Sequence, residues 1–430
     1  MMPLLSSLLI AGLLTAFVAQ AQFFVPIPPP PSAAAAASSS QLLLSSTSLG
    51  ASSSADRWMA VGYTANGLAT ADFKSMVFPV AGTITSIRAR TVTNPASGNW
   101  TFTLVKNGSD TALTCQITSA SSGLCSGSGS IDIAAGDWAS IKIDPGAPSA
   151  GSIIATSLIF VPTTANDTLI PAAGTNFSAA SQQAAGPFGN AAVSVVANRR
   201  LNVLPDGGTL DKFYVVSNAP GASTSYAYEI YKNGVASGIG GSTGNTCIVA
   251  DANTTCNDAV DSVSVSASDD ISFAGTPTNT PAAATAGFGL RYRPTTTGSF
   301  ALMVTGQVTA EGTTDTVFYP LAGGSGGGTT VEANWQNVSD TMTITKLLVE
   351  LPSAPGSGKS RTYTLRKNGS DTALTCTIED ATTSCSACAS GCEVTGGPIT
   401  VAANDLLATS AAPSGSPAAV APQISYLANR

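Results

Sequence analysis

A ten-residue stretch at positions 106–115, Lys-Asn-Gly-Ser-Asp-Thr-Ala-Leu-Thr-Cys, recurs letter for letter at positions 367–376. A looser version begins with Lys-Asn-Gly at Lys232 and is followed by a cysteine at Cys247. Internal repeats constrain the fold more strongly than composition does, because every copy must form the same supersecondary unit. The chain is therefore predicted to contain three copies of one module.

Each copy of the repeat contains an Asn-Gly pair, which lies at positions 107–108 in the first copy. This pair predicts a two-residue β-hairpin loop, since a type I′ turn needs positive φ at both central residues. In the register that follows, Phe102 faces Leu113. Tyr363 faces Leu374 in the third copy. This register puts alternate residues of each hairpin on one apolar side, toward a core.

Short strands with period-two alternation surround each hairpin, and no segment has convincing helical periodicity. This pattern predicts an all-β chain of three tandem antiparallel β-sandwich domains of jelly-roll-like type. The predicted boundaries are 56–163, 164–298 and 299–430. The predicted correspondences between copies one and three are a first strand, at 58–63 and 300–305, and a Pro-containing segment, at 77–82 and 317–323.

Charged residues make up 10% of the 430-residue chain, the net charge is −7, and the pI is near 4.6. A nucleic-acid-binding surface needs a basic stripe, which this composition does not supply. The chain has no histidine. This removes the commonest general base, the histidine-dependent triads and most zinc and iron sites. We therefore expect no catalysis, with a carboxylate-dependent polysaccharide hydrolase as the enzyme alternative.

Positions 4–18 form an apolar run that is followed by the small-x-small sequence Ala19-Gln20-Ala21. This pattern predicts a secretory signal peptide, residues 1–21, although no Lys or Arg precedes the run. A retained hydrophobic anchor is the alternative. Residues 22–55 are rich in Pro, Ala and Ser, which predicts a polyproline II start and then a flexible stalk. The mature protein is thus expected to be exported, without a membrane span.

One pair of cysteines, nine or ten residues apart, accompanies the hairpin in each copy. In an exported chain such pairs predict one disulfide per module. The predicted pairs are Cys115–Cys125, Cys247–Cys256 and Cys376–Cys385. Copy three adds Cys388 and Cys392, for which a local disulfide is predicted. The alternative is a four-thiolate zinc site, built from Cys376, Cys385, Cys388 and Cys392.

Positions 102–108, 129–138 and 157–160 combine an Asn-Gly hairpin, a Gly-Asp turn and a final strand with an aromatic end. In these features the module resembles the second half of jelly rolls of the tumour-necrosis-factor and complement globular-head type. Copies two and three depart from that pattern at the Gly-Asp turn, which reads Ser268-Asp269 and Asn404-Asp405. The module also resembles repeats of bacterial surface and phage structural proteins. The resemblance implies a fold and no particular function.

Copy two gathers four residues with oxygen ligands in one loop region: Asp251, Asn253, Asp258 and Asp261. Such residues are calcium candidates, but their spacing matches no ordered loop motif, and a solvated acidic loop is the alternative. Trp138, directly after the Gly-Asp turn, is a candidate surface for binding sugar or protein. Its counterparts, Asp270 and Leu406, are not aromatic, which favours a packing role.

These observations predict an exported structural or adhesive protein of the cell surface or of an extracellular appendage, without catalysis or cofactor. Tandem modules suit such a role, because linked binding sites raise the effective concentration of one another. A secreted carbohydrate-binding protein and a virion fibre or decoration protein are the alternatives. The expected partners are other protein subunits, including further copies of the chain, or surface glycans.

Overall fold

The computed structural model describes residues 40–47, 56–61, 64–65, 76–95, 97–146, 152–188, 193–194, 202–240, 247–304, 311–322, 329–334, 336–388 and 394–430. All of them belong to one compact unit, Ser38–Arg430. The predicted signal peptide, residues 1–21, and the first part of the predicted stalk, residues 22–39, lie outside the described residues.

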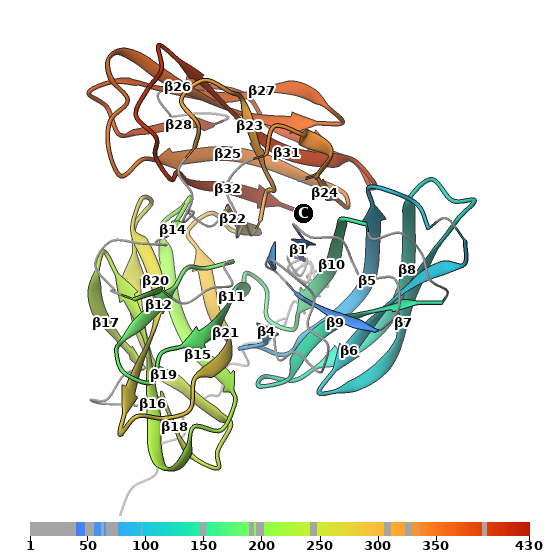
Figure 1. Ribbon diagram of the computed structural model, residues 1–430, viewed down its shortest axis with the longest axis vertical. Helices are drawn as coiled ribbons and strands as arrows, with labels where there is room; N and C mark the ends of the chain where they lie inside the picture. Colours follow the sequence, from blue (N-terminus) through green and yellow to red (C-terminus); the bar gives the residue numbers. More distant parts are fainter. Residues whose placement is uncertain are drawn as a thin grey trace, which may run out of the picture. The chain divides into compact units, whose positions relative to one another are not determined.

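The fold is all-β, as predicted, and the strands form six largely antiparallel sheets. The single helical element in the described part of the chain is a short 3-10 helix, η1 (Glu332–Asn334). The sheets fall into three pairs along the chain, which we call modules one, two and three; in Figure 1 they run from blue to green, from green to yellow and from orange to red. In each module the terminal sheet holds the first and last strands, and the hairpin sheet holds the Asn-Gly hairpin.

Module one has its terminal sheet in the order β3 (Thr64–Ala65), β1 (Gln41–Thr47), β10 (Ile154–Pro162), β5 (Gly82–Thr91) and β8 (Leu124–Ile133). Its hairpin sheet has the order β2 (Arg57–Ala60), β9 (Trp138–Pro145), β6 (Asn99–Lys106) and β7 (Ser109–Thr118), with β4 (Met76–Val77) also on β9.

Module two has its terminal sheet in the order β11 (Thr168–Phe177), β21 (Ala284–Pro294), β15 (Gly208–Ser217) and β19 (Thr255–Val265). Its hairpin sheet has the order β13 (Val193–Ser194), β12 (Gln183–Ala185), β20 (Asp270–Thr278), β16 (Gly221–Lys232) and β17 (Val235–Gly240), with β14 (Asn202–Val203) on β20 and β18 (Cys247–Asp251) on β16.

Module three has its terminal sheet in the order β22 (Ser299–Val304), β32 (Gln423–Asn429), β25 (Met342–Glu350), β28 (Ser384–Cys388) and β29 (Val394–Thr395), with β30 (Ile399–Val401) on β25. Its hairpin sheet has the order β23 (Val317–Tyr319), β31 (Leu406–Ser414), β26 (Gly356–Lys367) and β27 (Ser370–Asp380), with β24 (Asn337–Val338) also on β31.

The same strand order recurs in all three modules. In the terminal sheet the first strand pairs with the last, and the last pairs with a central strand, which is β5, β15 or β25. In the hairpin sheet a short strand, which is β4, β14 or β24, pairs with the strand that lies beside the hairpin. This alternation between two sheets is the order of a double-sheet jelly roll. The predicted fold class is confirmed.

Strand β1 corrects the predicted extent of the stalk. The sequence assigns residues 22–55 to the stalk, whereas β1 pairs with β10 in the terminal sheet of module one. Leu43 packs in the core of module one, while Leu42 and Leu44 join the core cluster that contains modules two and three. Three consecutive leucines mark this strand because both of its faces are covered, so the alternation of a half-buried strand is absent.

The predicted correspondences between copies one and three are wrong by one element. Strand β22 pairs with the last strand of its module, as β1 does, so β22 corresponds to β1 and not to the segment at 58–63. Val77 pairs with Trp138, and Val338 pairs with the counterpart Leu406. The partner of the segment at 77–82 is therefore β24. The error arose because β23 has a similar apolar and aromatic composition and pairs with the same strand.

The hairpin turns are confirmed, but the register beyond them is shifted by a bulge. Both turn residues have positive φ in every module, for example 49° at Asn107 and 79° at Gly108. Phe102 pairs with Cys115 rather than with Leu113, and Tyr363 pairs with Cys376 rather than with Leu374. Because the shift is by two residues, each side chain keeps its predicted face.

A threonine hydroxyl occupies the bulge. Thr111 Oγ1 donates to the Leu104 carbonyl at 2.7 Å and accepts from the Leu113 amide at 3.2 Å. Module three repeats these two hydrogen bonds at Thr372 with the same distances. The identical sequence of the two hairpins therefore encodes an irregularity as well as a turn, since the hydroxyl replaces ladder hydrogen bonds that the bulge removes.

The short strands β4, β14 and β24 link the modules, and we call them the bridging strands. Strand β4 of module one contacts β11, β21 and β15 of module two. Strand β14 of module two contacts β22, β32 and β25 of module three, and β24 of module three contacts β1, β10 and β5 of module one. Each bridging strand thus meets the first, last and central strands of the next module. The contacts form a closed cycle of three heterologous interfaces, which we call the 1–2, 2–3 and 3–1 junctions.

Candidate functional site

The Asn-Gly turn of each hairpin is joined to the turn that precedes Trp138 or its counterpart. In module one, Asn107 Nδ2 donates to Asp137 Oδ1 at 2.7 Å, and the Trp138 amide donates to Asn107 Oδ1 at 2.9 Å. The other carboxylate oxygen of Asp137 accepts from the Ala134 amide at 2.8 Å and pairs with Lys106 Nζ at 2.9 Å. We call this arrangement the Asn–Asp clasp.

The Asn–Asp clasp recurs in modules two and three. The equivalent Asn Nδ2 to Asp Oδ1 hydrogen bonds are Asn233–Asp269 and Asn368–Asp405, both at 2.7 Å. The residue before the aspartate has positive φ in all three modules, and it is Gly136, Ser268 or Asn404. The departures from a Gly-Asp turn are therefore sequence variants of one conformation, in which the shared aspartate is the constant part.

Hydrogen bonding lowers the pKa of two of the clasp aspartates. Partial burial acts to raise the pKa of Asp137, but hydrogen bonds from the Ala134 amide, Asn107 and Lys106 outweigh burial and lower the pKa. The pKa of Asp269 is lowered by the matching set of groups in module two. These two carboxylates act as acceptors in the structural hydrogen bonds of the clasp.

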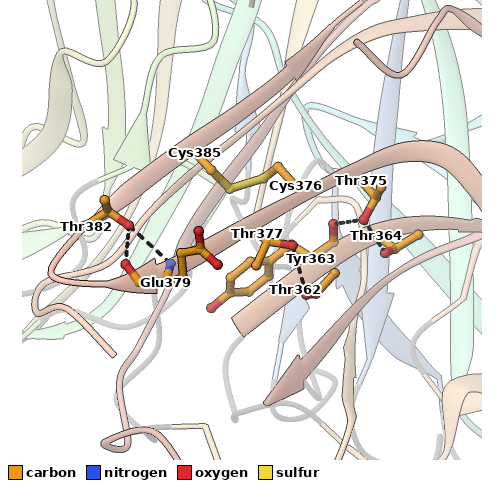
Figure 2. The surroundings of a disulfide bond; sticks show 9 residues. All are labelled: Thr362, Tyr363, Thr364, Thr375, Cys376, Thr377, Glu379, Thr382 and Cys385. Atoms are coloured by element: carbon orange, nitrogen blue, oxygen red, sulfur yellow. Dashed lines mark hydrogen bonds between the residues drawn. A yellow bond between two sulfur atoms is a disulfide. The ribbon is translucent and has the colours of Figure 1, made fainter. Parts of the chain in front are cut away.

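The three disulfides predicted from the sequence are present. They are Cys115–Cys125, Cys247–Cys256 and Cys376–Cys385. Each joins the hairpin sheet of its module to the terminal sheet, and each closes a short loop worth roughly 2–3 kcal/mol in the chain-entropy model. Figure 2 shows the bridge of module three beside two pairs of threonine hydroxyls, Thr362–Thr377 and Thr364–Thr375, across β26 and β27.

The disulfide predicted between Cys388 and Cys392 stays a prediction. Cys388 ends β28, and Cys392 lies outside the described residues. Cys376 and Cys385 are used in a disulfide, which removes two of the four thiolates that the zinc alternative needs. The four-thiolate zinc site is therefore wrong, because a disulfide sulfur is no thiolate ligand.

Among the calcium candidates of module two, Asp251 and Asp258 accept hydrogen bonds from different backbone amides. Asp251 Oδ1 accepts from a backbone amide at 2.7 Å, and Asn253 lies exposed in the turn between β18 and β19. Asp258, only 2% exposed, accepts from three backbone amides, one of them that of Asp261. In the part of the chain that the structure describes, no three His, Cys, Asp or Glu side chains form a group that could hold a metal ion.

Trp138 is half-buried at the start of β9, where it pairs with Val77 of the bridging strand. Its counterparts Asp270 and Leu406 make the same backbone hydrogen bond with the clasp asparagine as Trp138 does. This equivalence fits the packing interpretation, because the position is defined by the clasp whatever side chain it carries.

The 3–1 junction contains charged side chains that the sequence analysis did not single out. Arg88 of β5 donates through Nε to Asp340 at 2.9 Å and through a terminal nitrogen to Asn404 at 2.8 Å. Asp340 is 6% exposed and also pairs with Arg430 at 3.3 Å. Arg90 donates to the Ala333 carbonyl at 2.9 Å. No local pattern marks these residues, because the groups that meet lie hundreds of positions apart.

The 1–2 junction is made instead by close approach of backbone. A Cβ atom placed on Gly289 of β21 would lie 1.8 Å from the Val77 carbonyl oxygen of β4. Glycine is the residue that permits such an approach. The side chain of Gln41 adds two hydrogen bonds to the backbone of Leu169, at 2.8 and 2.7 Å. In register, Gly289 corresponds to Ser157 and Ser425, which are both buried.

The 2–3 junction brings two carboxyl groups together. Burial, followed by the charges of Glu350 and Asp269, raises the pKa of Asp270 to about 6. Burial also raises the pKa of Glu350, although a hydrogen bond with Ser268 acts to lower it. Shifted carboxyl groups can mark catalytic sites. The sequence analysis singled out no acid and base pair for the hydrolase alternative, and Asp270 and Glu350 are the carboxyl groups that a test of it can change.

One buried position differs in chemistry among the three modules. Trp100, Tyr226 and Arg361 each pair with a proline of the neighbouring strand and are each fully buried. Arg361 forms an ion pair with Glu311 at 2.6 Å, and burial raises the pKa of Glu311, although Arg361 acts to lower it. Arg361 also donates to two backbone carbonyls at 2.8 and 3.2 Å. The pair anchors loops at the end of module three.

A groove of about 500 Å³ lies beside Ser40 and Arg430, and most of its lining area is apolar. We call it the polar groove, after the hydroxyl, amide and guanidinium groups among its lining residues. It is lined by Ser40, Thr341, Met342, Thr343, Thr400, Asn429 and Arg430. Its hydroxyl, amide and guanidinium groups could bind hydroxyl-rich ligands, but the lining contains no Asp or Glu side chain and no aromatic ring. The arrangement offers hydrogen bonding and no general acid or base.

No protein-family model matches the chain, and no curated protein matches it. A solved structure described as PNGF-II in the C2 space group aligns with a TM-score of 0.19 and 7% identity, over 80% of this chain and 98% of that chain. A likeness this low carries no argument about fold or function. The resemblance to tumour-necrosis-factor and complement heads thus finds support at the level of β-sandwich modules and no further. No helix of the described residues is long and apolar enough to cross a membrane.

Proposed function

We propose that the protein is an exported structural or adhesive component, in which the three modules act together as one head that residues before β1 hold away from their attachment point. The observation that carries this proposal is the closed cycle of junctions. A chain of independent modules would leave each terminal sheet open on its outer face. Here the bridging strand of another module covers that face, as a rigid head requires.

The use of charged groups also supports a role without catalysis. Asp137 and Asp269 accept hydrogen bonds in the Asn–Asp clasp, and Asp340 forms an ion pair at the 3–1 junction. The charge of Glu350 in module three acts on Asp270 in module two, so this pair belongs to the 2–3 junction, whereas the polar groove is lined by other residues. An active site needs its acid and base beside a place for substrate.

The test is to locate the protein in its source and to sequence its N-terminus. We expect a mature chain that begins after Ala21 and that is released with the surface or appendage fraction by shear. Recovery of the protein as a free monomer in the culture medium would contradict the structural role. Recovery in purified virions, with residues 1–21 retained, would favour a fibre or decoration protein instead.

A second candidate function is carbohydrate binding in the polar groove. Thr341, Thr343, Thr400 and Asn429 supply the hydroxyl and amide groups that hydrogen-bond sugars. A glycan array probed with the full chain tests this candidate, with Thr343→Val and Thr400→Val as the variants that remove two hydroxyls from the groove. Binding that both variants abolish supports the candidate, while binding that they leave unchanged places any glycan site elsewhere. Hydrolysis of a polysaccharide by repurified protein, lost in Asp270→Asn, would overturn the role without catalysis.

A further inference from the structure

The 3–1 junction differs from the other two junctions because no peptide connection joins its partners directly. Modules one and two are connected by the short segment between Pro162 and Thr168, and modules two and three by that between Pro294 and Ser299. Modules three and one meet only through noncovalent contacts. If the cycle opens, the 3–1 junction is where it can open without stretching a linker of a few residues.

The arginine contacts of this junction join donors on module one to acceptors on module three. Asp340 of module three, 6% exposed, pairs with Arg88 of module one at 2.9 Å. Asn404 of module three accepts from the same guanidinium at 2.8 Å, and backbone carbonyls of module three accept from Arg90. Module one therefore contributes cationic donors, and module three contributes a carboxylate and oxygen acceptors. An open chain would expose these two complementary faces at opposite ends of its module series.

The apolar part of the junction is also divided between the two ends of the chain. Leu42, Leu44 and Ile159 on the outer face of module one's terminal sheet belong to the core cluster of modules two and three. Asn337 of β24 donates to the Ser45 carbonyl at 3.5 Å. Opening would expose this apolar face to water. The hydrophobic effect would then favour burying it against any molecule that presents a surface like that of module three.

Every copy of the chain carries both faces, so a second copy offers that complement. We propose that the 3–1 junction is also an interface between copies of this chain, in which module three of one molecule docks on module one of another through the contacts that otherwise close the cycle. Heterologous interfaces of this kind close into rings or continue into chains, and exchange of an element between identical molecules needs no new contacts. This inference does not depend on the proposed surface role.

Charge reversal on the full chain tests the proposal. Arg88→Asp places two carboxylates at the junction, and Asp340→Arg places two guanidinium groups there, so each variant alone should neither close its cycle nor pair with itself. In an equimolar mixture, module three of the first variant meets the unaltered Arg88 of the second, and the remaining junction has the reversed pair. We expect a heterodimer in size-exclusion chromatography with light scattering, at least about tenfold more stable than either homodimer.

Two control chains complete the experiment. The double variant Arg88→Asp/Asp340→Arg restores an ion pair within one chain, and we expect it to be monomeric when dilute. Lys142→Asp reverses a charge in an exposed ion pair with Asp110, away from the junction, and we expect no heterodimer with either variant. The proposal is overturned if the mixture stays monomeric while circular dichroism shows folded protein, or if the Lys142→Asp chain pairs equally well.

An independent measurement covers the case in which the single variants fail to fold. Wild-type chains labelled with a donor or an acceptor fluorophore are mixed in about 1 M salt, which screens charges beyond roughly 3 Å, and are then returned to low salt. We expect energy transfer between chains to develop only in the mixed and returned sample. Its absence over a concentration series overturns the proposal.

Discussion

The 1–2 and 3–1 junctions use equivalent strands but different contacts: close packing of backbone at the first and ion pairs at the second. At both, a bridging strand lies against the first, last and central strands of the next module. At the 1–2 junction the strands approach so closely that Gly289 leaves no space for a Cβ atom beside the Val77 carbonyl. At the 3–1 junction, ion pairs of Arg88 and Asp340 cover the equivalent region.

This difference shows how three copies of one module can take fixed places in a cycle. If all three outer faces were alike, any module could meet any other, and the cycle could close in the wrong order. Unlike chemistry makes the wrong pairs unfavourable, because a half-buried Arg88 would meet no carboxylate and a bulky side chain would clash at Gly289. The modules share their interiors and differ at their contacts.

The largest effect that the comparison predicts is at Gly289. Gly289→Val should lower the free energy of unfolding by about 3 kcal/mol, because the new side chain clashes with backbone that cannot rotate away. The measurement is chemical denaturation of the full chain. Gly312→Ala is the matched control, since nothing lies within 4 Å of a Cβ placed there, and it should change stability by less than about 0.5 kcal/mol. Equal losses of stability in the two variants would show that the close approach of Gly289 to Val77 is not what makes this position sensitive.

At the 3–1 junction, Asp340→Ala should lower the free energy of unfolding by about 2 kcal/mol, since Arg88 and Arg430 lose a charged acceptor that is nearly inaccessible to water. The side chain of Asp371, which pairs with Arg366, is 65% exposed. Asp371→Ala should therefore lower the free energy of unfolding by less than about 0.5 kcal/mol. Denaturation at low and high salt measures both. A cost for Asp371→Ala as large as that for Asp340→Ala would argue against a special role of the junction pair.

The Asn–Asp clasp should behave alike in all modules, in contrast to the junctions. Asn107→Ala, Asn233→Ala and Asn368→Ala each remove two side-chain hydrogen bonds and leave alanine at a positive φ that asparagine tolerates better. Each should cost about 1.5 kcal/mol. Thermal denaturation of the three variants provides the comparison. Costs that differ widely among modules would show that the clasp is not one repeated element.

The last prediction concerns the pH response of the 2–3 junction. The pKa of Asp270 is raised to about 6 in the folded chain. A carboxyl group with a raised pKa stabilises the folded state fully below the unfolded pKa, near 4, and that stability is lost as the pH rises through 6. Asp270→Asn should therefore equal wild type near pH 4 and have the higher Tm at pH 7. A Tm difference that is constant between these pH values would refute the shift.

Much of each module could be predicted because its signals are local. Asn107 and Gly108 require positive φ and so specify the turn, and Cys115 and Cys125 lie close enough in sequence to meet across the two sheets. The register beyond the turn could not be predicted. It depends on Thr111, whose hydroxyl replaces ladder hydrogen bonds, and a threonine at that position reads equally well as an ordinary strand residue.

The stalk boundary was missed for a related reason. Gln41–Thr47 has no alternation and follows a run of Ala and Ser, so nothing in its own sequence separates an anchor, a linker and a strand buried on both faces. Its burial is decided by Leu169 and by the outer face of another module, which no local pattern reports.

By itself, the sequence determined the repeated hairpin, the disulfide of each module and the all-β class, because turns, alternation and short loops depend on residues a few positions apart. Only the tertiary structure decided that Arg88 meets Asp340, that Gly289 meets Val77 and that the three modules close on one another. These contacts join residues that are far apart in the chain. Their chemistry becomes visible only when folding removes them from water together.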